Sequence, residues 1–435
     1  MITKENGLRY AKLIHVSVDN GSTSNSNKVY IMEELSDGRI KCEYGRVGNS
    51  LTTEYKDKNK WDAVLKQKLS KAKGYTDVTD FIAEPVSTKT PSGPGNTLIS
   101  VISDSVVKEL IQRLSDFANK TIKENYKVTQ EAVSEQQVNA AQEVLTLVTQ
   151  TAAIGVDKKT LNDLLLKLYT IIPRKMSDVK YYLLDDIKTP ADLDKALAFL
   201  NKEQATLDTM AGQVELIKKQ KELDKKLEDE AKGIKEEAPV TSYTILDQMG
   251  IEVEHVTDNK VIEAVKKQLE GHARKLHKVY AVVNKKTQPR FDEKLKNSKN
   301  KLVELLFHGS RCANWFNILQ TGLLIRPSGA GYNGSMWDDG IYFANDADKS
   351  MGYTDGGRWV GGSSSYTYLG LFQAHLGNQL HAHQHNSDSY KISKRVKAEG
   401  YDSVYAHKGA SLRKDELIIY DASQCTIKYL VELKN

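Results

Sequence analysis

Three short stretches in the last third of the chain carry side chains that could bind and polarise a substrate. Residues 302–315, "LVELLFHGSRCANW", place a histidine, a glycine and a serine after an apolar run that is typical of a strand. Residues 340–354, "GIYFANDADKSMGYT", and 414–421, "KDELIIYD", add two tyrosines, a serine and a glutamate. The candidate residues are His308, Gly309, Ser310, Tyr342, Ser350, Tyr353 and Glu416. All lie at predicted strand ends or in the turns after them, where distant segments can assemble a cleft.

Each of these residues also has a plain structural interpretation. Tyr342 fits a core aromatic, and Glu416 fits a charge on an edge strand. Only the combination of three segments indicates a site.

Two other motifs are weaker indications of a functional site. Residues 329–334, "GAGYNG", match a dinucleotide-binding pattern that needs a strand before it and a helix after it. Pro327 and Ser328 precede the motif and "SMWDDG" follows it, so we interpret it as a loop. Residues 381–385, "HAHQH", would place three histidines on one face of a strand. No carboxylate or cysteine cluster stands beside them, which favours a solvated loop over a metal site.

Composition limits the class of protein. The chain has 435 residues, a formal net charge of +5 and a pI of about 8.7, which suggests two to four domains and does not by itself demand nucleic acid. No run is long enough for a membrane span, and the N-terminus lacks the apolar core of a signal peptide. The three cysteines are too scattered for a zinc ribbon or a disulfide framework, so we expect an intracellular protein.

The N-terminal residues 1–84 predict a small β-rich module. Residues 28–35 and 39–47 read as strands joined by a turn, and residues 59–73 read as a helix with Asn59 as a plausible N-cap. Seven lysines fall between Lys56 and Lys73. Such a run is either a solvated helix face or a phosphate-binding surface.

The middle of the chain predicts helices. Residues 85–97 hold three prolines and read as a linker. Residues 98–232 predict a helical bundle: apolar residues follow the helix period in 107–117, 133–152 and 160–172, and residues 203–232 form a long, Lys/Glu-rich helix. Pro173 ends one of these helices, and Gly233 is the predicted stop of the last.

Residues 233–435 predict an α+β domain with an antiparallel-rich sheet. The predicted strands are 302–307, 340–344, 366–376, 416–420 and 427–433. The whole chain is therefore expected to be an α+β multidomain protein, with a β-rich module, an all-α bundle and a mixed C-terminal domain.

Taken together, these features resemble the poly(ADP-ribose) polymerases. The resemblance lies in the order His-Gly-Ser, then Gly-Ile-Tyr-Phe-Ala with Lys-Ser and a second Tyr, then Glu before an apolar strand. Residues 1–84, with "YGRVG", resemble the WGR domain, and residues 98–232 resemble the regulatory helical domain. Residues 233–435 resemble the ADP-ribosyltransferase catalytic domain.

The resemblance implies NAD⁺ as substrate, with no metal or redox cofactor. His308 and Asn314 would bind the adenosine side, and Gly309 would pair with the nicotinamide carboxamide, with Ser310 nearby. Ser350 would donate a hydroxyl to the same carboxamide, and Tyr342 and Tyr353 would bracket the ring. Glu416 would bind the nicotinamide ribose and help activate the acceptor. The set His308, Tyr342 and Glu416 accompanies polymer formation in this family.

The resemblance also implies a DNA partner. Tyr44, Gly45 and Arg46 stand where the family's Trp-Gly-Arg packs against a DNA end and its 5′ phosphate. The sequence departs from the family after residue 321, where Gly-Leu-Leu-Ile replaces Gly-Leu-Arg-Ile and the nearest arginine is Arg326. The loop 355–365 could cover the cleft.

The resulting hypothesis is a DNA-stimulated poly(ADP-ribosyl)transferase that modifies itself and nearby proteins. The location would be nuclear in a eukaryote and cytoplasm or nucleoid in a prokaryote. A mono-ADP-ribosyltransferase, a DNA-end-binding scaffold without activity and, more remotely, a metal hydrolase using residues 381–385 are the alternatives.

Overall fold

The structure is a computed structural model. It describes residues 2–3, 7–18, 25–81, 101–126, 133–153, 157–233, 244–325, 336–358, 362–409 and 412–435. The "GAGYNG" motif, Arg326 and the linker 85–97 lie outside these residues. Among the described residues, no helix combines the length and the apolar character needed to cross a membrane.

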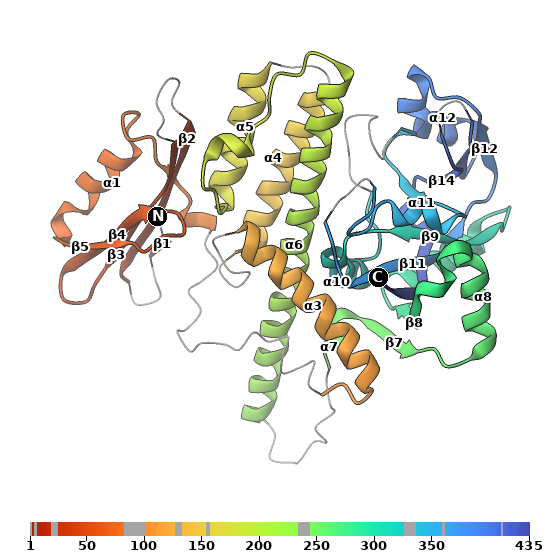
Figure 1. Cartoon of the computed structure of the whole chain (residues 1–435). Helices are drawn as coiled ribbons and strands as arrows, with labels where there is room; N and C mark the ends of the chain where they lie inside the picture. Colours follow the sequence, from red (N-terminus) through yellow and green to blue (C-terminus); the bar gives the residue numbers. More distant parts are fainter. Residues whose placement is uncertain are drawn as a thin grey trace. The chain divides into compact units, whose positions relative to one another are not determined.

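The chain forms two compact units (Figure 1). Unit 1 comprises Met1–Lys89 and Thr121–Val214, and unit 2 comprises Thr90–Lys120 and Glu215–Asn435. Two long helices, α3 (Ser105–Asn125) and α6 (Pro190–Gly233), contribute residues to both units. The residues predicted as one helical domain are thus divided between the units.

The β-rich part of unit 1 is a six-stranded antiparallel sheet. Its strands are β1 (Ile2–Thr3), β2 (Arg9–Val18), β3 (Asn25–Glu34), β4 (Arg39–Arg46), β5 (Thr52–Asp57) and β6 (Thr76–Asp77). The order is β1-β2-β3-β4-β5, with β6 paired to β2. Helix α1 (Trp61–Leu69) buries Trp61 against Met32, Ile40 and Cys42 of the sheet.

One local prediction in this module was wrong. Asn59 does not cap α1, because residues Lys58–Lys60 form a separate 3-10 turn. Asp57 caps that turn by accepting a hydrogen bond from the backbone N–H of Asn59. The helix therefore begins at Trp61, two residues later than predicted.

Besides α1, unit 1 contains the helices α4 (Glu135–Ala153) and α5 (Lys158–Ile171), the end of α3 and the first part of α6. Asp157 caps α5 through the backbone N–H of Thr160, and the helix ends before Pro173 as predicted. Helix α6 begins at Pro190 rather than at residue 203, and it ends at Gly233 as predicted.

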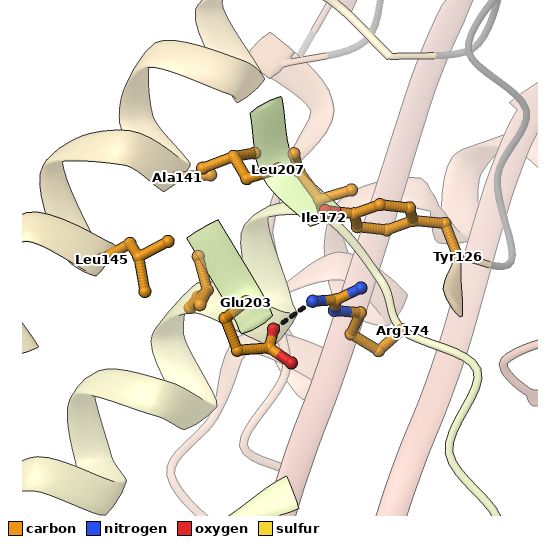
Figure 2. Close-up of a pocket in the computed structure, with 8 residues that line it drawn as sticks. Tyr126, Ala141, Leu145, Ile172, Arg174, Glu203 and Leu207 are labelled. Atoms are coloured by element: carbon orange, nitrogen blue, oxygen red, sulfur yellow. Dashed lines mark hydrogen bonds and ion pairs between the residues drawn. The ribbon is translucent and has the colours of Figure 1, made fainter. Parts of the chain in front are cut away.

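A buried ion pair ties the chain after α5 to α6 (Figure 2). Arg174 and Glu203 are 3% and 6% exposed, so neither charge is screened by bulk water. The Arg174 guanidinium also lies 4.3 Å from the centroid of the Tyr126 ring. The remaining side chains around the pair are Ala141, Leu145, Leu168, Ile172 and Leu207.

Unit 2 contains two sheets, ordered β7-β8-β15-β11-β9 and β10-β14-β13-β12. The strands are β7 (Ile251–His255), β8 (Leu276–Asn284), β9 (Val303–Gly309), β10 (Ile341–Phe343), β11 (Tyr366–His375), β12 (Gln379–Ala382), β13 (Ser403–Ala406), β14 (Glu416–Ile419) and β15 (Cys425–Lys434). The pairings between these strands are antiparallel except β12–β13, which confirms an antiparallel-rich α+β region. The prediction missed β7, β8, β12 and β13.

Helices cover both sheets of unit 2. They are α7 (Ile245–Met249), α8 (Asn259–Leu269), α9 (Thr287–Asn297), α10 (Cys312–Thr321), α11 (Ala347–Met351) and α12 (Ile392–Glu399). The main core joins α3 and α10 to the facing sides of both sheets, with Leu114, Trp315 and Phe372 among its members. Helices α8 and α11 cover the other face of the larger sheet, and α12 covers the other face of the smaller one.

Candidate active site

The two sheets of unit 2 are joined where β9 meets β10. Phe307 and Ala344 exchange two backbone hydrogen bonds of 2.8 and 3.0 Å. This junction brings the end of β9, with His308 and Gly309, beside Tyr342 on β10. Strand β9 runs through Gly309, so the expectation that it stops before His308 was wrong.

His308 is fixed by a backbone contact. Its Nδ1 lies 3.0 Å from the carbonyl oxygen of Tyr342, and because a carbonyl can only accept, Nδ1 carries the proton. In the neutral ring Nε2 then keeps its lone pair and can accept a hydrogen bond. Burial lowers the pKa of His308 below its ordinary value of 6.5, while the bond to Tyr342 acts in the opposite direction. His308 is therefore a neutral acceptor near neutral pH.

Gly309 lies against α11. A Cβ at this position would collide with the backbone carbonyl of Ser350, so a side chain would push the two segments apart. Ser350 is itself 4% exposed, and its carbonyl accepts a hydrogen bond of 3.1 Å from the Tyr353 N–H. Glycine is thus required here by the close approach of two backbones.

Both candidate tyrosines lie near Glu416. Burial raises the pKa of Tyr353, and the negative charge of Glu416 raises it further. Burial likewise raises the pKa of Tyr342, with smaller contributions from Tyr420 and Glu416. The Tyr342 hydroxyl donates to the Asp338 carbonyl at 2.7 Å and accepts from the Trp337 N–H at 2.9 Å.

Glu416 is buried and paired. Its Oε1 lies 2.7 Å from Nζ of Lys349 on α11, and the two side chains are 7% and 15% exposed. Lys414, two residues before Glu416, contacts Asp346 and Asp348, and its Nζ lies 3.4 Å from Asp348 Oδ2. Contacts made by the two lysines, Lys349 and Lys414, therefore hold the start of β14 to α11.

Ser310 precedes α10, and Asn314 lies in its first turn. Asn314 Nδ2 donates to Ser310 Oγ at 2.9 Å. The first residue of α10, Cys312, donates its N–H to Asp355 Oδ2 at 2.7 Å. Asp355 therefore caps α10 and ties the segment that follows Tyr353 to this helix.

Contacts between segments thus bring together His308, Gly309, Tyr342, Ser350, Tyr353 and Glu416, while Ser310 and Asn314 bond to each other beside them. His308 contacts Tyr342, Gly309 contacts Ser350, Ser350 contacts Tyr353, and Lys349 between them contacts Glu416. The set offers a neutral acceptor, two aromatic rings, small residues and one buried carboxylate. Such groups bind an aromatic ligand and stabilise positive charge.

Comparison with known proteins agrees with this chemistry. A family model for the poly(ADP-ribose) polymerase catalytic domain matches residues 257–435. A putative poly [ADP-ribose] polymerase-like protein, 100L, of Invertebrate iridescent virus 6 is 32% identical over 163 residues, which cover 37% of this chain and 86% of that protein.

The chain belongs to the poly(ADP-ribose) polymerase family. It is an enzyme that transfers ADP-ribose from NAD⁺.

Longer relatives of this family match more distantly. Poly [ADP-ribose] polymerase 1 of Gallus gallus is 25% identical over 334 residues, 69% of this chain and 30% of that protein. Protein mono-ADP-ribosyltransferase PARP3 of Homo sapiens is 28% identical over 163 residues, 30% of this chain and 28% of that protein.

The three residues predicted to contact DNA lie at the end of β4 in unit 1. Tyr44 stacks on Tyr30 with ring centroids 5.5 Å apart. Arg46 Nη2 donates to the carbonyls of Met176 and Ser177 at 3.3 and 2.8 Å. At Gly45 a Cβ would lie 3.1 Å from Leu51 Cδ2. Arg46 thus joins the β-rich module to the segment after α5.

His381 lies on β12, at the opposite edge of the smaller sheet from β10 and Tyr342. His385, by contrast, packs against Trp337, whose N–H bonds the Tyr342 hydroxyl. His381 Nδ1 is 2.8 Å from His407 Nε2, and the His383 and His407 rings stack at 4.3 Å. Within the described part of the chain, no group of three or more histidine, cysteine, aspartate or glutamate side chains could hold a metal ion.

Sequence reasoning missed four residues that shape the site. Lys349 stood in the quoted Lys-Ser pair, and its position before Ser350 was the available signal. Asp355 and Lys414 had no such signal, because their partners Cys312 and Asp346 lie in other segments. The Asp338 carboxylate had none either, because it bonds Ser393 on α12.

Proposed function

We propose that this transferase builds poly(ADP-ribose) on itself and on nearby proteins, and that DNA ends stimulate it. The observation that carries the proposal is Glu416, a buried carboxylate paired with Lys349 and lying near Tyr342 and Tyr353.

In this proposal NAD⁺ lies along the end of β9. The neutral His308 accepts a hydroxyl of the adenosine ribose through Nε2, since Nδ1 is occupied by the Tyr342 carbonyl. Ser310 and Asn314 line the same side, and Gly309 and Ser350 pair with the nicotinamide carboxamide. The Tyr342 and Tyr353 rings stack on the nicotinamide, which holds the leaving group flat.

The reaction breaks the bond between nicotinamide and its ribose. Positive charge develops on the ribose as nicotinamide leaves with the bonding electron pair, as in glycoside cleavage. The Glu416 carboxylate accepts a ribose hydroxyl and offsets that charge. Glu416 also takes the proton of an acceptor hydroxyl as that oxygen attacks, which permits chain elongation when the acceptor is itself an ADP-ribose unit.

A DNA-end partner is supported by unit 1. Tyr44, Gly45 and Arg46 occupy one strand end, and Arg46 presents a guanidinium, the group best suited to phosphate. The match to the Gallus gallus protein spans 334 residues, which is more than residues 257–435 contain. The match therefore extends before residue 257, which supports a helical regulatory part.

The second candidate is a mono-ADP-ribosyltransferase. The relative from Homo sapiens carries that activity in its name and is similar to this chain over 163 residues. The set His308, Tyr342 and Glu416 favours the polymerase, because Glu416 is available to activate a sugar hydroxyl.

One experiment separates these functions. The purified chain is incubated with labelled NAD⁺, with and without a short 5′-phosphorylated DNA duplex, and the products are resolved on a denaturing gel. We expect a high-mass smear that grows when DNA is added. A sharp band would favour single transfer, and equal labelling with and without DNA would contradict the DNA-end proposal.

A further inference from the structure

The segment before β10 contains a residue in an unusual backbone conformation. Asp338 has φ of 68°, in the left-handed region that non-glycine residues rarely adopt. Aspartate tolerates this region better than most residues, but an alanine there is strained. Something in the fold must therefore hold Asp338 in place.

Its carboxylate supplies that hold. Asp338 Oδ2 accepts hydrogen bonds from both the N–H and the hydroxyl of Ser393, in the first turn of α12, with the N–H bond at 3.1 Å. Asp338 Oδ1 accepts the N–H of Asp339 at 2.9 Å. The side chain thus anchors a turn of the chain to a helix more than fifty residues away in the sequence.

The backbone of the same turn holds the hydroxyl of Tyr342. That hydroxyl donates to the Asp338 carbonyl at 2.7 Å and accepts from the Trp337 N–H at 2.9 Å. Trp337 is 1% exposed, and its carbonyl accepts from the Tyr420 hydroxyl at 2.6 Å. The far end of the Tyr342 ring is therefore fixed at two points by a turn that is itself fixed.

We propose that Asp338 is a positioning residue for the nicotinamide site. Its left-handed backbone aims the carbonyl at the Tyr342 hydroxyl, and its carboxylate locks that conformation through Ser393. In the free protein, the ring of Tyr342 is thereby already held in the orientation in which it stacks on bound nicotinamide. The inference rests on the proposed role of Tyr342 in binding nicotinamide.

The test compares Asp338→Ala with Asp338→Asn in the full-length chain. Asparagine tolerates the left-handed region and keeps an oxygen for Ser393, whereas alanine does neither. We expect Asp338→Ala to raise the Kd of free nicotinamide and the KM for NAD⁺ roughly fivefold, with a smaller change in kcat, because pre-organisation of a ground-state contact is lost. Asp338→Asn should stay within about twofold of the parent.

A double-mutant cycle with Tyr342→Phe tests whether Asp338 acts through that hydroxyl. Phenylalanine keeps the ring but removes the group that Asp338 holds. Each single variant should raise the Kd of nicotinamide. The Kd of the double variant should not exceed that of the single variant that binds nicotinamide less tightly. Asp388→Ala, an exposed aspartate just before α12, is the matched control and should leave nicotinamide affinity unchanged.

Three outcomes would overturn the inference. If Asp338→Ala lowers the melting temperature but leaves nicotinamide affinity unchanged, the residue is only structural. If the double variant shows fully additive losses, Asp338 does not act through Tyr342. If Tyr342→Ala binds nicotinamide as the parent does, the assignment of Tyr342 in the proposed function fails as well, which distinguishes that failure from the first two.

Discussion

Replacing Gly309 by alanine, which adds only a Cβ, would disturb the site. Its Cα faces the backbone of Ser350, and an added Cβ would overlap the carbonyl there. His308, one residue earlier, depends equally on a backbone group, the carbonyl of Tyr342. Contacts with backbone atoms therefore define the positions of Gly309 and His308, and the contact of His308 also sets which of its ring nitrogens can accept a hydrogen bond.

The first prediction concerns Glu416. Glu416→Gln keeps the shape of the side chain but removes the negative charge that we propose offsets positive charge on the ribose. We expect polymer to disappear from the denaturing gel and the rate of nicotinamide release to fall roughly 100-fold. Some NAD⁺ cleavage or single transfer should remain, because the nicotinamide contacts are intact.

Glu399→Gln is the matched control for this prediction. Glu399 pairs with Arg395 on the exposed surface of α12, so its charge lies away from the site residues. Unchanged polymer length in the Glu416 variant would contradict the role assigned to this carboxylate.

The second prediction concerns the pH dependence set by His308. Because burial lowers its pKa below 6.5, the folded protein resists protonation that the unfolded chain accepts. Stability should therefore be constant from about pH 8 to about pH 7 and decline as the pH falls through 6.5. NAD⁺ affinity should decline only at lower pH, where His308 of the folded protein takes up a proton.

The measurement is KM for NAD⁺ across this pH range, together with the melting temperature. His308→Gln should show a higher KM at neutral pH and lack the decline that titration of the imidazole produces. If His308→Gln shows the same rise in KM at low pH as the parent, another group is responsible for the titration.

At the scale of elements, contacts between segments hold the site in register. Asp355 caps α10 from a segment more than forty residues away in the sequence, and Lys414 joins the approach to β14 to the start of α11. Unit 1 uses the same device in its helices, where Arg174 and Glu203 join the end of α5 to α6. Each contact joins the end of one element to a segment distant in the chain.

The third prediction concerns this helical pair. Arg174→Met should leave Glu203 as a buried charge without its partner and lower the free energy of unfolding of unit 1 by about 3–5 kcal/mol. Thermal or urea unfolding followed by circular dichroism would measure the loss.

Lys159→Met is the control, because Lys159 pairs with Asp163 on the exposed face of α5. Exposed pairs of this kind contribute well under about 1 kcal/mol. Equal losses in the two variants would show that burial does not decide the contribution of the Arg174 pair.

At the scale of the whole molecule, the chain combines a catalytic unit with a unit that carries the proposed DNA contacts. Within unit 1, Arg46 donates to the carbonyls of Met176 and Ser177, and Asn27 Nδ2 donates to the Arg174 carbonyl at 3.2 Å. The strand end proposed to meet DNA is thus bonded directly to the segment after α5, which carries Arg174. A ligand that competes for Arg46 would alter that contact, which is the differential interaction that a DNA-driven switch requires.

The fourth prediction concerns DNA stimulation. Arg46→Ala removes the guanidinium and its bonds to the segment after α5, so we expect the DNA concentration for half-maximal stimulation to rise roughly tenfold. The measurement is polymer formation against the concentration of a 5′-phosphorylated duplex.

Arg39→Ala is the control, since Arg39 lies at the other end of β4 and pairs with Asp37. An Arg46 variant that responds to DNA as the parent does would show that the DNA contact lies elsewhere.

Sequence pattern was sufficient for much of the architecture. The strands around residues 28–35, 39–47 and 366–376 and the helices at 133–152 and 160–172 were predicted because their apolar residues follow the strand or helix period. The start of α6 at Pro190 and the short strand β12 were missed, since one lacks a clear apolar period and the other has four residues.

For the candidate site, the sequence alone determined which residue types are present and in which order, and the order His308, Tyr342, Glu416 was enough to indicate the family. Only the tertiary structure decided their relations. The Phe307–Ala344 junction sets His308 beside Tyr342, Lys349 pairs with Glu416, and the Asp338 carboxylate bonds Ser393 of α12. All three contacts join residues distant in the chain. Periodicity reports which face of an element is apolar, but the distance between two elements depends on the packing of the whole unit, which no local pattern encodes.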